Sequence, residues 1–308
     1  MLSTFQKTIS DEITFKGVGL HSGLKTEVKI IPAANNHGIA FKRIDLEKNN
    51  IINANFKNVC SAKLCTTLQN EFNAKVSTVE HLLAALYITG IDNALIEINN
   101  SEVPIMDGSS KEFVESISKV GVKILNAKRK YLKITKKIEL KENEKVISIE
   151  PNKDGLKVDF QLVYNNQVIG TQSNQINFTD SNLTDVYSSR TFCLYEDIEK
   201  IKAIGLAKGG SLENAVVVKG DEILNAEGLR NNKEFVNHKI LDLAGDFLLS
   251  GYRILGDVKC SQGGHSLSNS FLRAIFKDQT NFVTIEQEET VLEKNYFKTS
   301  TNKLVVNA

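Results

Sequence analysis

The sequence has little cysteine, no excess of charge and no long apolar run, and each absence excludes a class of protein. Four cysteines occur in 308 residues, and because no two form a Cys-x-x-Cys pair, we expect neither a disulfide framework nor a thiolate metal site. The 38 basic and 37 acidic residues leave a net charge of +1, which gives no sign of a nucleic-acid partner. No stretch approaches the roughly 18 to 20 apolar residues of a membrane span, and the N-terminus lacks the basic-then-apolar order of a signal peptide. We therefore expect a cytoplasmic protein without a transmembrane segment.

Length and hydrophobic patterning predict two domains of the α+β class. A chain of 308 residues with 41% hydrophobic residues is long enough for about two domains. Alternating apolar and polar residues predict strands before residue 60, and helical patterns follow at 77–90, capped by Ser77 or Thr78, and at 111–120. A basic segment at 126–130 is predicted to be a linker, after which strands resume and lead to a helix at 235–251.

The second half of the chain repeats part of the first. Val79-Glu80-His81 opens the first predicted helix, and a similar Val-x-His sequence ends at His238 in the helix at 235–251. Gly251 follows His238 by 13 residues and Gly90 follows His81 by 9, a difference of about one helical turn. The repeat favours duplication of one α+β unit, with coincidence between two amphipathic helices as the alternative.

Histidine is scarce, with five residues, and one of them stands at metal-ligand spacing from an aspartate. His238 and Asp242 are four residues apart on a predicted helix, which suits two ligands of one ion, with a hydrogen bond or ion pair on the helix surface as the alternative. His81, at the head of the matching helix, would supply the third ligand of a catalytic zinc. Glu80 beside it would be a general base, although a first-turn glutamate also favours the helix dipole. The His-Glu-x-x-His signature of zinc proteases is absent.

His265 follows two glycines directly after a predicted strand. We expect it in a flexible loop, where a general acid or an oxyanion partner would be placed; a structural histidine is the alternative. Asp246 lies one turn beyond Asp242 and would hold the His265 ring in its protonated form. Lys239, next to a predicted ligand, is either a cation for an anionic substrate or a solvated side chain.

Together these motifs resemble the UDP-3-O-acyl-N-acetylglucosamine deacetylases of lipid A biosynthesis in Gram-negative bacteria. The segments that carry the resemblance are STVEHLLAALYITGIDNALIEI, SEVPIMDGSS, RTFCL, GGSLENAVVV, EGLR, FVNHKILDLAGDFLLSG and GGHSLSN. The resemblance implies two similar domains, each a mainly antiparallel sheet with helices, and it implies that the helices pack between the two sheets. The implied divisions are a first domain at 1–126, a second domain at 131–280, an insert at about 195–218 that forms a passage for an acyl chain, and a C-terminal tail at 281–308.

The resemblance also implies the chemistry of the site. It places one zinc ion on His81, His238 and Asp242, and Fe²⁺ suits the same ligands nearly as well. Glu80 is then the general base and His265, oriented by Asp246, the general acid, although one carboxylate could serve both steps. Thr191 would bind the oxyanion and Lys239 the substrate. The implied substrate-binding residues are Leu20, His21, Cys65, Tyr164, Phe192, Ala207, Gly210 and Ala215.

The implied reaction is zinc-dependent hydrolysis of the 2-acetamido group of UDP-3-O-[(3R)-3-hydroxyacyl]-N-acetylglucosamine by a monomer, in the committed step of lipid A biosynthesis. Two alternatives stay open. A zinc hydrolase of another acylated amino sugar would differ in its passage residues, and a non-catalytic nucleotide-sugar binding protein would have no need to keep Glu80 and all three ligands. The lipid tail of the substrate also leaves transient membrane contact open.

Overall fold

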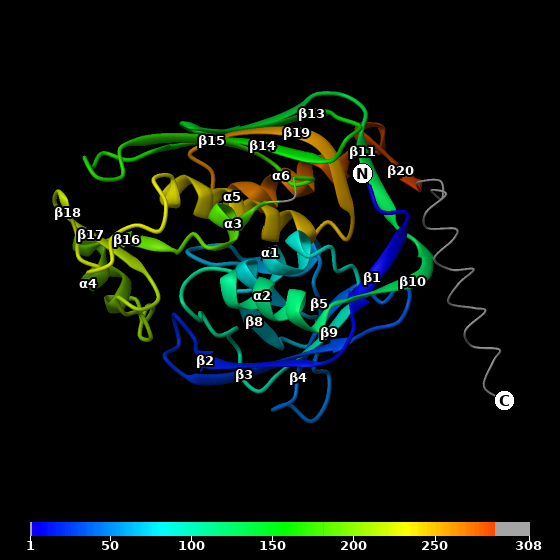
Figure 1. Ribbon diagram of the computed structural model, residues 1–308, viewed down its shortest axis with the longest axis horizontal. Coiled ribbons are helices and arrows are strands. Elements are labelled where there is room, and N and C mark those ends of the chain that lie inside the picture. Colours follow the sequence, from blue (N-terminus) through cyan, green and yellow to red (C-terminus); the bar gives the residue numbers. More distant parts are fainter. Residues whose placement is uncertain (1, 181, 287–308) are drawn as a thin grey trace.

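The computed structural model describes residues 2–180 and 182–286, which form three layers. In Figure 1 one sheet lies above, another lies below, and the main helices fill the space between them. The expected α+β class is confirmed, and so is the position of the helices between the two sheets. No described helix is both long enough and apolar enough to cross a membrane.

The first half of the chain forms the lower sheet, in the order β2-β3-β9-β4-β5, with all neighbours antiparallel except β4 and β9. Along β3 the alternate residues Thr26, Val28 and Ile30 are buried, because only one face of this sheet is covered. The covering helices are α1 (Glu80–Ile88) and α2 (Lys111–Val120). The strands are β2 (Ile13–Val18), β3 (Lys25–Pro32), β4 (Ile39–Arg43), β5 (Ile51–Asn53) and β9 (Ala94–Ile98).

A small antiparallel sheet leads directly into α1. It consists of β6 (Val59–Ser61), β7 (Thr67–Gln69) and β8 (Lys75–Ser77), preceded by a 3₁₀ turn, η1 (Phe56–Asn58). The expected helix cap is wrong, because Val79 is the N-cap of α1 and no side chain bonds to the cap. The hydroxyl of Thr78 instead donates to Glu102 at 2.9 Å.

The second half forms the upper sheet, in which the central strand β19 pairs with β13 and, in parallel, with β11 and β14. Beneath this sheet lie three helices, α3 (Thr184–Tyr187), α5 (Glu234–Leu248) and α6 (His265–Lys277), the last followed by a 3₁₀ turn, η2 (Gln279–Asn281). The strands are β11 (Lys130–Ile134), β12 (Ile138–Glu142), β13 (Lys145–Pro151), β14 (Leu156–Val163), β15 (Thr171–Asn177), β19 (Arg253–Ser261) and β20 (Phe282–Glu286).

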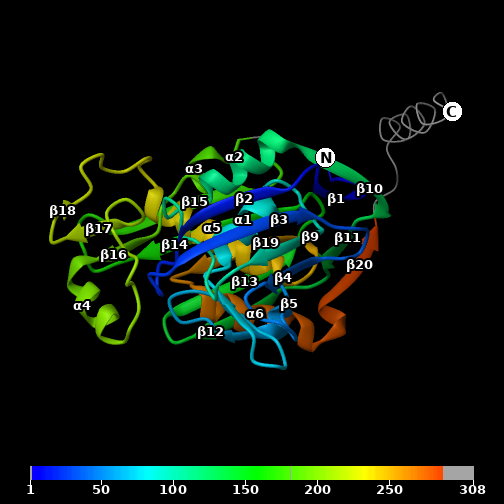
Figure 2. The ribbon, with the colours of Figure 1, turned by 90° about the horizontal axis from the view of Figure 1, so that it is seen from below.

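A separate small sheet projects at one end of the molecule, far from the N-terminus in both views (Figures 1 and 2). Its elements are β16 (Phe192–Leu194), α4 (Tyr195–Ala203), β17 (Val216–Lys219) and β18 (Glu222–Ile223). At the opposite end, β1 (Phe5–Ile9) pairs with β10 (Val122–Lys128).

Two expectations for irregular segments differ from the structure. The predicted linker at 126–130 is largely strand, since β10 runs to Lys128 and β11 starts at Lys130. The predicted tail at 281–308 starts within the fold, because β20 pairs with β11 along its whole length. Residues 287–308 of that tail lie outside the described residues.

The two central helices approach each other closely at Gly245 of α5. A Cβ atom added to Gly245 would lie 2.1 Å from the carbonyl oxygen of Glu80. Only glycine therefore allows α5 to pack this closely against the first turn of α1, where two of the predicted site residues are found.

Candidate metal centre

Helices α1 and α5 bring three metal-binding side chains together between the sheets. His81 is the second residue of α1, and His238 and Asp242 lie one turn apart on α5. Asp242 Oδ1 lies 3.5 Å from His81 Nε2 and 3.4 Å from His238 Nε2. One ligand atom from each residue can be chosen so that all three lie within 4.8 Å of one another. The spatial grouping of these residues agrees with the arrangement expected of one metal site.

Polar atoms without partners indicate that the group is built to hold an ion. Three buried side-chain atoms of the described residues have no hydrogen-bond partner, and two of them, Asp242 Oδ1 and His81 Nδ1, belong to this group. An unpaired buried atom costs about 1–3 kcal/mol. Nδ1 of His238 lies 3.1 Å from the Ser189 carbonyl oxygen; because a carbonyl only accepts, Nδ1 carries the proton and Nε2 is left as the ligand. Burial lowers the pKa of His238 to about 3, which keeps the ring neutral, as a ligand must be. The donor set fits a divalent transition-metal ion.

Lys239 neutralises part of the charge on Asp242. Its Nζ donates to Asp242 Oδ2 at 2.7 Å. Burial lowers the pKa of Lys239, but the carboxylate outweighs this effect and the pKa is raised overall. Burial likewise opposes ionisation of Asp242, yet the pKa of Asp242 is held well below its usual value by His238, which is charged only in the acidic range where Asp242 titrates, and by Lys239 and His265. The carboxylate is therefore ionised and available to a cation.

Glu80 and His265 lie beside the ligands as a second pair of ionisable groups. Glu80 Oε1 is 3.7 Å from His265 Nε2, and His265 Nδ1 is 2.9 Å from Asp246 Oδ2. Burial raises the pKa of Glu80. Burial lowers the pKa of His265, but Asp246, Glu80 and Asp242 together raise it to about 10. A protonated imidazole thus faces a buried carboxyl group, and these two groups can serve as a general acid and a general base.

His265 does not lie in a flexible loop, contrary to the expectation from its two preceding glycines. It is the first residue of α6, with Gly264 as the N-cap. Gly263 serves close packing, since a Cβ there would lie 2.3 Å from Cys260 Sγ. The histidine is therefore held by a helix on one side and by Asp246 on the other.

Thr191 lies on a segment that is fixed to the metal-binding helix. Its backbone N–H donates to the Gly108 carbonyl at 2.8 Å. The preceding residue, Arg190, is 1% exposed and forms an ion pair with Glu234 of α5, which is 0% exposed, at 2.8 Å. The contact between Ser189 and His238 is part of the same segment. Thr191 is consequently positioned relative to His238 through two neighbouring residues.

The predicted substrate-binding residues fall into groups. The ring centroid of Phe192 lies 5.7 Å from that of Tyr164 and 6.3 Å from that of His238. Lys239 Nζ lies 5.7 Å from the same Phe192 centroid. At a second place the segment 207–210 packs on residues 20 and 21: the Gly209 N–H donates to the Leu20 carbonyl, and the Ala207 N–H approaches His21 Nδ1 at 3.4 Å. Cys65 is buried close enough to Glu80 for that charge to affect its pKa. Gly210 approaches Leu20, and Ala215 is buried immediately before β17.

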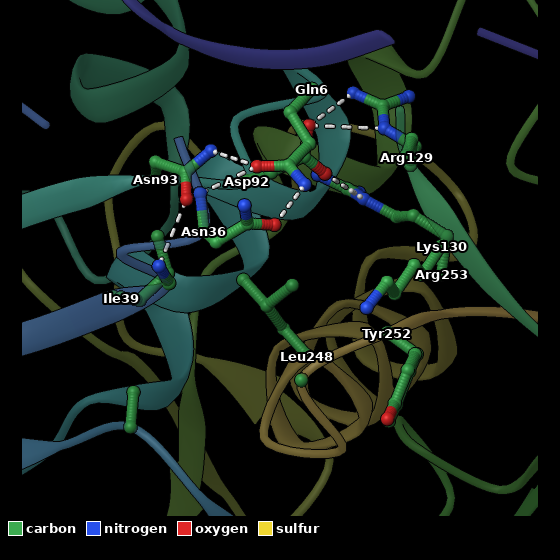
Figure 3. Close-up of a pocket in the computed structure, with 13 residues that line it drawn as sticks. Gln6, Asn36, Ile39, Asp92, Asn93, Arg129, Lys130, Leu248, Tyr252 and Arg253 are labelled. Atoms are coloured by element: carbon green, nitrogen blue, oxygen red, sulfur yellow. Dashed lines mark hydrogen bonds and ion pairs between the residues drawn. The ribbon is translucent and has the colours of Figure 1, made fainter. Parts of the chain in front are cut away.

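The pocket drawn in Figure 3 is separate from these ligands and lies at the C-terminal ends of α1 and α5. It measures about 280 Å³. Its polar side chains bond to one another: Arg129 donates to Asp92 at 2.6 Å, and Asn93 donates to Gln6 at 3.0 Å. We interpret it as part of the junction between the two halves of the chain.

Sequence reasoning missed several residues that hold the site. Ser189 orients His238, Glu234 pairs with Arg190, and Thr66 bonds to both Glu80 and Asp246. Serine, threonine and single ion-pair residues carry no spacing signal, because their partners here are 14 to 180 residues away in the chain.

The chain is similar to a known protein family over most of its length. The family model described as UDP-3-O-acyl N-acetylglycosamine deacetylase matches residues 6–277. Similar curated proteins named UDP-3-O-acyl-N-acetylglucosamine deacetylase occur in Citrifermentans bemidjiense, with 41% identity over 92% of both chains, and in Geotalea uraniireducens, with 43% identity over 87% of both chains. A protein of the same name from Idiomarina loihiensis is 40% identical over 92% of this chain and 94% of its own.

Proposed function

The chain belongs to the UDP-3-O-acyl N-acetylglycosamine deacetylase family, and from this premise we propose that it hydrolyses the 2-acetamido group of UDP-3-O-[(3R)-3-hydroxyacyl]-N-acetylglucosamine. The products are acetate and UDP-3-O-acyl-glucosamine, and the reaction is the committed step of lipid A biosynthesis. The observation that carries the proposal is the grouping of His81, His238 and Asp242 with Glu80 and His265 beside them.

The proposed metal is one Zn²⁺ ion per chain, held by His81, His238 and Asp242, with Fe²⁺ as the alternative. Two imidazoles and one carboxylate are the ligands typical of catalytic zinc. When bound, such an ion supplies Lewis-acid chemistry, because it makes water acidic enough to ionise near neutral pH and polarises a carbonyl oxygen.

The residues around the ion divide the proton transfers between them. Glu80 accepts the proton of the attacking water at Oε1, since Oε2 already accepts the Thr66 N–H at 3.0 Å. His265 donates from Nε2 to the departing amine, because an amine anion is too poor a leaving group to depart unprotonated. Asp246 holds the other ring nitrogen, so that Nε2 points toward Glu80. The Thr191 hydroxyl donates a hydrogen bond to the developing oxyanion, and Lys239 binds the substrate.

Residues along a passage from this centre bind the rest of the substrate. The proposed set is Leu20, His21, Cys65, Tyr164, Phe192, Ala207, Gly210 and Ala215. Two groups of contacts support two portions of one passage. One group joins Tyr164, Phe192 and Lys239, and the other joins residues 20–21 to residues 207–210.

We further propose that the chain divides into domains at 1–126 and 131–280, the second completed by the paired strand β20. We also propose that the insert at about 195–218 forms the acyl passage and that the protein acts as a monomer in the cytoplasm. The separate small sheet of β16, β17 and β18 at one end of the molecule supports the proposal of an insert (Figure 2). The four cysteines are free, as expected in a reducing compartment.

Metal content and acetate release, measured together, test the reaction and the site. The wild-type protein is expected to hold one equivalent of zinc and to release acetate from the acylated UDP-sugar. Glu80→Gln is expected to keep the metal and to lose about 10²- to 10⁴-fold in kcat, whereas His238→Ala loses the metal. His37→Ala, a change at an exposed histidine, serves as the matched control and retains both.

Each contrary result has a distinct meaning. Bound metal without acetate release, across substrates of several acyl lengths, would identify a hydrolase of another acylated amino sugar or a binding protein. Absence of metal from the correctly folded wild-type protein would overturn the ligand assignment.

A further inference from the structure

Thr66 occupies a position between the two halves of the site. It lies immediately before β7, in the loop that follows β6, and only 2% of its surface is exposed. Its backbone N–H donates to Glu80 Oε2 at 3.0 Å, and its hydroxyl donates to Asp246 Oδ1 at 2.7 Å. Glu80 belongs to α1 and Asp246 to α5, so one residue binds side chains from both central helices.

These contacts close a ring of four residues. From Thr66 the hydroxyl reaches Asp246 Oδ1, and Asp246 Oδ2 lies 2.9 Å from His265 Nδ1. His265 Nε2 lies 3.7 Å from Glu80 Oε1, and Glu80 Oε2 returns to the backbone N–H of Thr66. Each carboxylate in the ring therefore uses one oxygen toward Thr66 and the other toward His265.

We propose that Thr66 is a positioning residue of the deacetylase reaction, which sets the separation and orientation of Glu80 and the His265–Asp246 pair. The inference rests on the proposed function for the roles of Glu80 and His265. Thr66 itself touches neither substrate nor reacting atoms and acts through its neighbours. Its hydroxyl prevents the Asp246 carboxylate from turning, since both carboxylate oxygens are then occupied, and this keeps the ring of His265 directed at Glu80.

The nearly isosteric substitution Thr66→Val isolates the hydroxyl, because it removes that group and leaves the backbone N–H on Glu80. We expect kcat to fall roughly 10- to 100-fold, the usual effect of removing a group that orients a catalytic residue. KM should change less than about twofold, because the lost interaction favours the transition state and not substrate binding. Thr66→Ser restores the hydroxyl and is expected to recover kcat to within about threefold of the wild type.

A double-mutant cycle tests whether the hydroxyl acts through Asp246. If it does, Thr66→Val causes no further loss of kcat in an Asp246→Asn background. Multiplicative losses in the double variant, or a Thr66→Val enzyme with wild-type kcat, would overturn the proposal. Thr8→Val is the matched control, because Thr8 is also buried and its hydroxyl bonds to the Asn93 carbonyl at 2.7 Å, remote from the site; it should lower the melting temperature and leave kcat unchanged.

A measurement without turnover separates this inference from the proposed function. Proton spectra of the full-length protein labelled with ¹⁵N-histidine report the Nδ1 proton of His265, assigned by its loss in His265→Gln. The resonance should move in Thr66→Val and stay in place in Thr66→Ser. If wild-type protein releases no acetate but this resonance responds as stated, the proposed function fails and the positioning contact stands; an unmoved resonance in Thr66→Val contradicts the contact itself.

Discussion

At the residue scale, the four cysteines are expected to differ in reactivity. Cys60 is exposed, whereas burial raises the pKa of Cys65 and of Cys260 to about 12, with the Glu80 charge adding to the effect at Cys65. A raised pKa keeps the thiol neutral at pH 8, and the neutral thiol is a poor nucleophile. Iodoacetamide at pH 8 should therefore modify Cys60 and spare Cys65 and Cys260, as measured by mass spectrometry of peptides.

The control for this prediction is the same reaction in concentrated urea, where all four cysteines should react alike. Between pH 7 and 9 the two buried thiols should stay unmodified in the folded protein, since both values lie below a pKa of about 12. Modification of Cys65 as fast as that of Cys60 would contradict the burial of that side chain.

The sequence predicts the roles of scarce residues at characteristic spacings, but it does not predict the roles of common residues. The i, i+4 spacing of His238 and Asp242 and the Glu-His pair at the head of the first helix suggested which side chains would meet, and the structure groups them. Thr66 gave no such signal, because its role depends on a partner 180 residues away. The two glycines before His265 predict a flexible loop, because glycine has the widest backbone freedom. In the structure Gly263 instead allows close packing.

At the scale of elements, helix periodicity was a better guide than predictions of irregular structure. The predicted helix at 77–90 contains α1, of which residues 80–87 are buried, and α5 lies largely within the predicted helix at 235–251. The segment at 126–130 was read as a linker from its charge. Its pairing could not be read, since Lys128 in β10 lies opposite Phe5 at the other end of the first half.

The contact between α1 and α5 gives an element-scale prediction at Gly245. An alanine methyl group at this position would lie 2.1 Å from the Glu80 carbonyl oxygen and 3.1 Å from the Ala84 nitrogen. Because both atoms belong to the backbone of α1, the helices must separate, at a cost of about 1–3 kcal/mol. Gly245→Ala should therefore lower the stability measured by urea unfolding by that amount, and kcat should fall because Glu80 moves with its helix. Unchanged stability and kcat would show that the helices are not packed at this distance.

At the scale of the whole molecule, the layered architecture was accessible because family motifs run through both halves of the chain. The sequence does not predict the contacts at the junction between the two halves. Arg129, in the segment read as a linker, bonds to Asp92, and Arg253 donates to the carbonyls of Leu86 and Ile91 at the end of α1. A buried arginine that satisfies helix carbonyls is a consequence of tertiary packing, and its sequence context does not distinguish it from a solvated one.

The same geometry predicts that metal stabilises the whole molecule, because His81 comes from α1 and the other two ligands come from α5. An ion that binds only the folded protein adds about 2.7 kcal/mol at a free concentration 100 times its Kd, which corresponds to a rise of roughly 5 °C in melting temperature for a chain of this size. Calorimetry should show that rise when zinc is returned to chelator-treated protein, and Mg²⁺ should have no effect, since it prefers oxygen ligands. His238→Ala should melt at one temperature with or without zinc, whereas His37→Ala should respond like the wild type. A melting temperature unchanged by complete removal of the metal would mean that the three side chains do not bind the ion together, and the link between α1 and α5 at this site would have to come from Thr66 and its carboxylate partners alone.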